Sequence, residues 1–141
     1  QLINLGLKVH SHKPKIEIKK KIDIYLVNTF GQTKSFYSII KTIFLGGSLI
    51  NHGGQNPLEA ANYNCNILHG PHTSNFSEIY KYLDKQKISK KINNVNQAVK
   101  YLKKQMSKKI KKNNARIKIN KIGQKILKKN INEIILVLKK L

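Results

Sequence analysis

Glycines, histidines and small polar residues are concentrated in one segment, residues 42–80, which contains no Lys and no Arg. All 28 basic residues of the 141-residue chain lie outside it. Three runs carry its chemistry: Gly46-Gly47-Ser48, the eight residues from His52 to Glu59 (HGGQNPLE), and Gly70-Pro71-His72. Glycine lets a backbone approach a ligand closely, and backbone N–H groups can hold a phosphate. We therefore expect this segment to form the functional surface.

The glycine pair Gly46-Gly47 is a weak signal when taken alone. It is neither the spaced glycine fingerprint of dinucleotide-binding folds nor a P-loop, which requires Gly-Lys-Ser or Gly-Lys-Thr. Its position carries more weight, because ligands of open parallel sheets bind beyond the carboxyl ends of the strands. Both this pair and Gly70 directly follow a predicted strand.

The run from Asn56 to Glu59 (Asn-Pro-Leu-Glu) has the pattern of a helix start. Asn56 can cap the helix, Pro57 suits its first position, and Glu59 stands three residues after the cap. Glu59 then has two interpretations: it bonds back to the Asn56 backbone N–H, or it accepts hydrogen bonds from the diol of a ribose. Residues 75–78 repeat the capping pattern, so both interpretations stay open.

The five histidines fall into groups. His10 and His12 follow the first predicted strand and are expected at the surface. His52 and His72 lie in the glycine loops, where they can approach an anionic ligand, whereas His69 ends a strand and is expected to be packed. The spacing matches no common zinc motif, so we expect no metal site. The single cysteine excludes an internal disulfide.

Apolar runs bounded by glycine or proline predict strands that alternate with helices. The expected strands cover residues 7–10, 22–27, 42–45 and 65–68, and the expected helices cover 32–41, 57–63 and a stretch that begins at 76. In the first of these helices we place Phe36, Ile39 and Ile40 on the buried side. Alternating strands and helices are typical of an α/β fold with a parallel sheet and helices on its faces.

The tail from Lys85 onward carries 19 of the 28 basic residues. Residues 95–106 predict an amphipathic helix with Val95, Val99, Leu102 and Met106 on one side, and 107–122 cannot be assigned. Residues 123–141 predict a second helix. Its apolar stripe, at spacings of three and four, is expected to pack against the rest of the protein: Leu127, Ile131, Ile134, Leu138 and Leu141.

The net charge of +22 has two interpretations. Lysines that neutralise phosphates would indicate a nucleic-acid binder. However, Arg116 is the single arginine, and arginine is the usual residue for forked contacts to phosphates and bases. Excess Lys, Asn and Ile is also what A/T-rich codons produce on solvated faces. In either case the surface would attract anionic membranes or nucleic acid.

Taken together, these runs resemble the C-terminal half of the Kdo transferases, which transfer 3-deoxy-D-manno-octulosonic acid (Kdo) in bacterial lipopolysaccharide synthesis. The resemblance covers about residues 22–83, and the tail fits only in order and helicity. It is carried by four segments: Asn28-Thr29-Phe30-Gly31 with Tyr37, Gly46 to Leu49, His52 to Ala61, and Gly70-Pro71-His72 with Asn75, Phe76, Glu78 and Ile79. Gln32, Gln55 and Ala60 depart from the common pattern.

The resemblance implies a GT-B glycosyltransferase with two Rossmann-like halves. Residues 1–141 would be the C-terminal donor-binding domain with a helical tail, N-terminally truncated and lacking the acceptor domain. The donor would be CMP-Kdo, with no cofactor and no metal at the reacting centre. The nucleotide-sugar site would comprise Gly46, Gly47, Ser48, Gly54, Asn56, Glu59, Gly70, Pro71 and His72, with Glu59 on the ribose.

The resemblance also implies partners outside this chain. The acceptor would be a lipid A precursor at the cytoplasmic face of the bacterial inner membrane, whose anionic surface the lysines could face. The enzyme would lie there peripherally or be anchored through its N-terminal part. That part would also carry the catalytic base, so we expect the chain alone to be inactive. The absence of an initiator Met fits a piece of a longer protein.

Two alternatives remain at this stage. The first is another GT-B enzyme that uses a UDP-sugar, which would prefer UMP to CMP. The second is a basic ribosomal or nucleic-acid-binding protein, which would use the Lys-rich tail and have no need for Glu59. The lack of Lys and Arg in the glycine loops argues against the second, and we expect no nucleic-acid partner.

Overall fold

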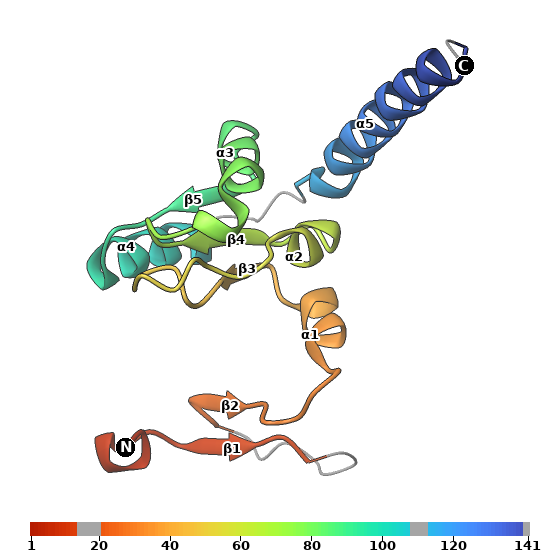
Figure 1. The fold of residues 1–141 in the computed structure, drawn as a ribbon. Helices are drawn as coiled ribbons and strands as arrows, with labels where there is room; N and C mark the ends of the chain where they lie inside the picture. The colour runs from red at the N-terminus through yellow and green to blue at the C-terminus, as the bar shows by residue number, and fades with distance from the viewer. Residues whose placement is uncertain (14–20, 108–112, 140–141) are drawn as a thin grey trace. The chain divides into compact units, whose positions relative to one another are not determined.

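The computed structural model of the chain describes residues 1–13, 21–107 and 113–139, which form two compact units. Gln1–Phe36 is the smaller unit, and Tyr37–Leu141 is the larger one. Their helices and strands are drawn in Figure 1. The larger unit contains the segment without Lys or Arg.

The smaller unit is built on a pair of parallel strands. Strand β1 (Val9–Ser11) pairs with β2 (Ile24–Leu26), with Val9 opposite Ile24. A short 3-10 helix precedes them and ends at Gly6, whose φ of 77° is in the left-handed region. Both strands were predicted, at residues 7–10 and 22–27; the first was placed too early, and the second was predicted too long.

Aromatic rings cover the two histidines of this unit. His10 stacks on Tyr25, with ring centroids 5.5 Å apart, and His12 Nδ1 lies 2.6 Å from the Tyr25 hydroxyl. The His12 ring also meets Phe36 edge to face. Both histidines are half-buried, so the prediction that they lie at the surface is wrong.

The larger unit contains a three-stranded parallel sheet in the order β3-β4-β5 (Figure 1). Its central strand pairs in register with both neighbours, so that Ile67 lies opposite Ile43 on one side and Ser89 on the other. The strands are β3 (Thr42–Phe44), β4 (Asn66–His69) and β5 (Ser89–Lys91). Because all three run the same way, their carboxyl ends share one edge of the sheet.

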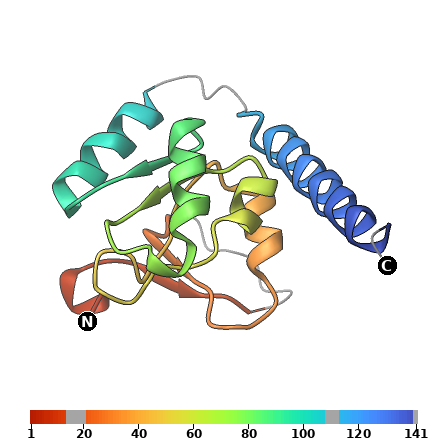
Figure 2. The same ribbon diagram turned by 45° about the horizontal axis from the view of Figure 1, so that its top comes forward.

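One apolar core joins the sheet to some of the helices that Figure 2 shows. The helices are α1 (Thr33–Ile39), which begins in the smaller unit, α2 (Leu58–Asn62), α3 (Ser77–Lys85) with a 3-10 turn before it (Ser74–Phe76), α4 (Val95–Met106) and α5 (Ala115–Leu138). The buried core residues are Leu45, Ala60, Ala61, Cys65, Ile67, Tyr80, Leu83, Ile88 and Ala115. The predicted parallel α/β architecture is confirmed.

The buried side of α1 differs from the prediction. Tyr37 packs against the core, and its carbonyl accepts a long hydrogen bond from the Cys65 thiol at 3.5 Å. Residues two apart on a helix point to nearly opposite sides. Ile39 is therefore 73% exposed, and Ile40, beyond the helix end, is exposed too, whereas Phe36 is half-buried.

Strand β5 was missed because Ser89-Lys90-Lys91 has no apolar residue to signal a strand. The flanking Ile88 and Ile92 are buried and hold the segment against the sheet. Two lysines are tolerated because β5 is an edge strand, where charged side chains also deter pairing with other chains.

The two tail helices are present, but their apolar rows are not covered. α4 has the predicted limits, and its four apolar residues are exposed. α5 begins at Ala115, earlier than predicted; only its first turns reach the core, through Ala115 and Ile119. Beyond them the predicted stripe is 45–62% exposed, and its last member, Leu141, is outside the described residues.

The predicted packing of this stripe is therefore wrong for the described part of the chain. No helix within those residues is long and apolar enough to span a bilayer.

Candidate functional site

Backbone hydrogen bonds join the two glycine loops that follow β3 and β4. The first loop closes on itself, as Gly54 N–H donates to the Gly47 carbonyl at 3.0 Å. The second loop is tied to the first at two points: His72 N–H donates to the Ser48 carbonyl at 2.9 Å, and Asn75 N–H donates to the Gly53 carbonyl at 3.1 Å. The three predicted runs therefore lie on two loops that form one cluster at the carboxyl edge of the sheet.

Ser48 supports this cluster from within. Its side chain is fully buried, and its hydroxyl donates to the Leu45 carbonyl at 2.7 Å and accepts from Gly70 N–H at 2.8 Å. A Cβ at Gly70 would lie 2.0 Å from the Ser48 carbonyl oxygen, so only glycine fits there. The Ser48 hydroxyl thus holds the loops together, and its contact with a ligand remains a prediction.

A second close approach involves Gly53 and Asn75. A Cβ at Gly53 would lie 2.4 Å from the Asn75 amide nitrogen, and Gly53 has a φ of 84°. Asn75 was predicted to cap α3, but no side chain caps that helix or the 3-10 turn before it. Asn75 instead lies against the first loop, which the capping pattern could not reveal.

The first loop leads directly into α2. Asn56 Oδ1 accepts a hydrogen bond from Leu58 N–H at 2.9 Å. The N-cap residue of α2 is Pro57, which makes no side-chain cap, so the prediction that Asn56 is the N-cap is wrong by one residue. The reciprocal bond from Glu59 is not formed. Among the described residues, the exposed Glu59 carboxylate takes part in no hydrogen bond or ion pair, so it stands open to a ligand.

The charge of Glu59 affects the pKa of the neighbouring Tyr37 phenol. Burial, followed by the Glu59 and Cys65 charges, raises the pKa of Tyr37. Tyr37 therefore stays neutral at physiological pH. Because residues 42–80 include no Lys or Arg, no ammonium group of this segment competes for the Glu59 carboxylate.

Below the loops lies a buried polar network centred on His69, which was predicted to be packed. Its Nδ1 is 2.7 Å from the Gly70 carbonyl oxygen, and its Nε2 is 3.1 and 3.2 Å from the Asp84 carboxylate oxygens. The ring is therefore held between two oxygen partners, one on each nitrogen. The Ser89 hydroxyl also donates to Asp84.

Tyr80 connects this network to the first loop. The ring centroids of Tyr80 and His69 are 4.4 Å apart, and the Tyr80 hydroxyl donates to the Gln55 carbonyl at 2.8 Å. Burial, with the charges of Asp84 and Tyr37, raises the pKa of Tyr80 to about 12. Tyr80 and Asp84 were missed as positioning residues; the one sequence signal was that Asp84 is among only six acids.

The remaining predicted residues lie in the same cluster. Gly46, Pro71 and His72 are exposed. The His52 ring lies beside Gly47, since a Cβ placed at Gly47 would be 3.3 Å from His52 Cδ2. No group of three or more His, Cys, Asp or Glu in the described ranges could hold a metal ion. The cluster is therefore suited to binding through backbone groups, amides and one free carboxylate.

Comparison with known proteins bears on what this edge binds. The chain is 40% identical over 60 residues to a 3-deoxy-D-manno-octulosonic acid transferase of Haemophilus influenzae and 33% identical over 64 residues to one of Aquifex aeolicus. It is also 38% identical over 80 residues to a bifunctional glycosyltransferase/methyltransferase of Fusobacterium nucleatum. No family model matches the chain.

A solved structure agrees with these matches. It is the C-terminal CMP-Kdo binding domain of WaaA from Acinetobacter baumannii, with a TM-score of 0.66 and 27% identity over 71% of this chain and 52% of that one. The chain is similar to the C-terminal part of Kdo transferases. The Kdo transferase resemblance and the GT-B C-terminal fold class predicted from the sequence are thereby confirmed.

The chain covers only part of the length of the curated relatives that it matches. The matched stretches span 43–57% of this chain but only 12–18% of the curated relatives' lengths. The Kdo transferase relatives do not favour the UDP-sugar enzyme or the nucleic-acid-binding protein. The roles of the nine site residues stay predictions.

Proposed function

We propose that this chain is the donor-binding part of a glycosyltransferase that moves Kdo from CMP-Kdo to a lipid A precursor in lipopolysaccharide synthesis. The observation that carries the proposal is the similarity, over 71% of the chain, to a domain described as CMP-Kdo binding. The loop cluster supports it, because the residues predicted for the nucleotide meet at the carboxyl edge of a parallel sheet.

In this proposal Glu59 accepts hydrogen bonds from the ribose hydroxyls of CMP. A carboxylate has two acceptor oxygens and suits a diol, and that of Glu59 makes no competing hydrogen bond within the described chain. Gly46, Gly47 and Gly54 allow the backbone to approach the phosphate. Gly70, Pro71 and His72 form another wall, held in place by Ser48.

The chain would bind and orient the donor, and it would not perform the transfer alone. The catalytic base and the acceptor surface would belong to an N-terminal domain. Detectable transfer of Kdo by the chain alone would contradict this division of roles. We place the full enzyme at the cytoplasmic face of the inner membrane, and the net charge of +22 supports contact with its anionic lipids.

The test is a calorimetric titration of the 141-residue chain with CMP and with UMP. We expect saturable binding that prefers CMP and that weakens by about 10- to 100-fold in Glu59→Gln, as expected for losing hydrogen bonds to a charged group. Glu78→Gln is the matched control, because Glu78 is also an exposed glutamate in the first turn of a helix.

Two results would contradict the proposal. Equal affinity for UMP would point to another donor, and unchanged CMP affinity in a folded Glu59→Gln variant would remove Glu59 from the site. Circular dichroism of both variants distinguishes loss of binding from loss of fold.

A further inference from the structure

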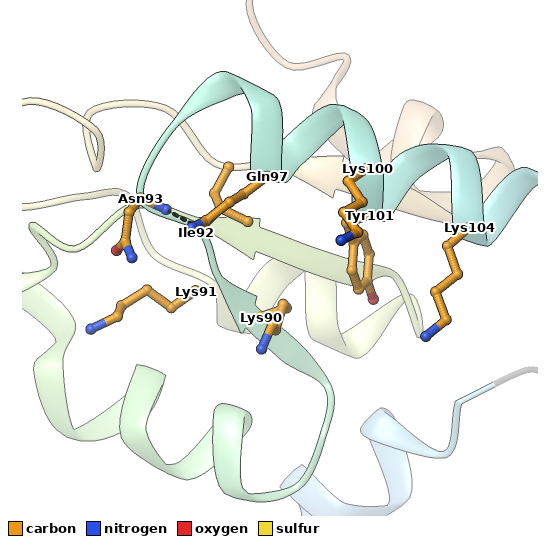
Figure 3. A pocket seen from close by; sticks show the side chains of 8 residues that line it. All are labelled: Lys90, Lys91, Ile92, Asn93, Gln97, Lys100, Tyr101 and Lys104. Atoms are coloured by element: carbon orange, nitrogen blue, oxygen red, sulfur yellow. Dashed lines mark hydrogen bonds between the residues drawn. The ribbon is translucent and has the colours of Figure 1, made fainter.

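A hollow lies apart from the glycine loops, between β5 and α4 (Figure 3). Its volume is about 500 Å³, which is within the range of ligand pockets. Lys90 and Lys91 line it from the strand, and Lys100, Tyr101 and Lys104 line it from the helix. None of its lining residues belongs to the segment 42–80.

The helix side of this pocket follows from the sequence spacing. Gln97, Lys100, Tyr101 and Lys104 are three or four residues apart and therefore share one face of α4. The orientation of the helix is set at its start, where Gln97 N–H donates to Asn94 Oδ1 at 3.0 Å and Gln97 Oε1 accepts from Asn93 N–H at 2.9 Å. The capped start thus places the basic face beside β5.

The ammonium groups of the four pocket lysines form no ion pair with a carboxylate in the described part of the chain. In residues 21–107 and 113–139, no carboxylate lies within ion-pair distance of any of them. The charge of Lys90 helps to lower the pKa of Asp84. The Asp84 carboxylate, however, is already bonded to His69 and Ser89. Four like charges around one hollow repel each other, and a multivalent anion between them would relieve that repulsion.

The chemistry of the lining favours phosphate. Lysine acts as a point charge that binds phosphate oxygens without the planar fork of arginine, and the pocket contains no arginine. Burial raises the pKa of Tyr101, against the effect of its hydrogen bond with Gln105. Its phenol therefore stays protonated and can donate a hydrogen bond to an oxyanion.

We propose that the pocket between β5 and α4 binds a phosphate-bearing anion, at a site separate from the glycine loops and independent of the CMP-Kdo assignment. A free phosphate and the headgroup of an anionic phospholipid share this chemistry. The lipid source is included because the adjacent row Val95, Val99, Leu102 and Met106 on α4 is exposed and apolar.

The test begins with a titration of the full chain with pyrophosphate at low salt, followed by amide chemical shifts in NMR. We expect saturable binding, with the largest shifts in residues 90–104. The double variant Lys100→Gln/Lys104→Gln should weaken binding at least about tenfold. The matched control, Lys103→Gln/Lys81→Gln, removes the same charge from exposed positions outside the pocket and should leave binding nearly unchanged.

A parallel arm with vesicles of phosphatidylglycerol and phosphatidylcholine separates the sources. A headgroup ligand predicts pocket-dependent vesicle binding that pyrophosphate displaces, and a soluble ligand predicts pyrophosphate binding with vesicle binding equal in the two double variants. The proposal is overturned if pyrophosphate does not saturate, if both double variants weaken binding equally, or if the shifts fall in the glycine loops.

Discussion

At the scale of residues, Ser48 and Gly70 together fix the loop cluster. Ser48 contributes a bonded hydroxyl, and Gly70 contributes the space left by having no side chain. The Ser48 hydroxyl has both its donor and its acceptor engaged inside the fold, and its carbonyl occupies the place where a Gly70 side chain would start. The glycine is therefore required by sterics, and not merely by the flexibility of a loop.

We predict that Gly70→Ala lowers the free energy of unfolding by about 1–3 kcal/mol or more, because the new Cβ overlaps a backbone carbonyl that cannot move aside. Gly123→Ala is the control, and we expect it to raise the free energy of unfolding. Gly123 lies inside α5, and nothing comes within 4 Å of a Cβ there. Alanine should stabilise the helix by about 0.5–1 kcal/mol.

Urea titration of both variants measures the two effects. A Gly70→Ala protein as stable as the parent would show that the two loops are not packed as described.

At the scale of elements, Asp84 links α3 to the end of β4 and the start of β5. Burial alone would raise the pKa of its carboxyl, but the hydrogen bonds from His69 and Ser89 and the charges of His69 and Lys90 together lower it from the ordinary 3.8. The ionised form is thus favoured in the folded chain. Its stabilising effect is fully present above pH 3.8 and is lost as the pH falls through the lower, folded-state pKa.

We therefore predict that Asp84→Asn destabilises the chain by about 1–2 kcal/mol near neutral pH. The effect is below that of a fully buried pair, because the Asp84 side chain is 36% exposed. The difference from the parent should shrink as the pH falls below about 3.8. Urea titrations across this range measure it, with Glu78→Gln as the exposed control; a difference that does not vary with pH would exclude the linkage.

The elements also show what could be predicted from the sequence. Strands β3 and β4, helices α2 and α4, and a local hydrogen bond of Asn56 at the start of α2 were predictable, because each has an apolar pattern or a local bonding rule of its own. Strand β5 was not, since its pairing depends on buried Ile88 and Ile92 beside it and not on its own two lysines. The hydrogen bonds between the loops span 22 or more residues and follow no local pattern.

The same distinction applies to the candidate site. The Gly, Asn and Glu residues were identified by type and position, and the structure brings the two glycine loops together. Tyr80, Asp84 and Asn75 were missed as positioning residues because their role depends on contacts across the fold. The apolar stripe of α5 was assigned correctly to a helix, but a sequence pattern does not say what covers a face.

At the scale of the whole molecule, charge is distributed unevenly along the chain: the net charge is +22, while the glycine loops carry no Lys and no Arg. Attraction of lysines to anionic lipid is long-ranged at low salt and screened at high salt. We predict that the chain binds vesicles containing phosphatidylglycerol at low salt and is released at high salt, as measured by co-sedimentation. Binding that does not depend on salt would contradict an electrostatic surface.

The hydrogen bonds between the glycine loops have a thermodynamic consequence. The loop cluster comes into existence only when β3 and β4 are paired, so an unfolded chain offers no site for a nucleotide. A ligand that binds only the folded form stabilises it by mass action, by about 2.7 kcal/mol at a hundred times its dissociation constant. The melting temperature of the chain would then rise with the concentration of its ligand, and candidate nucleotides could be ranked by heating the protein in their presence.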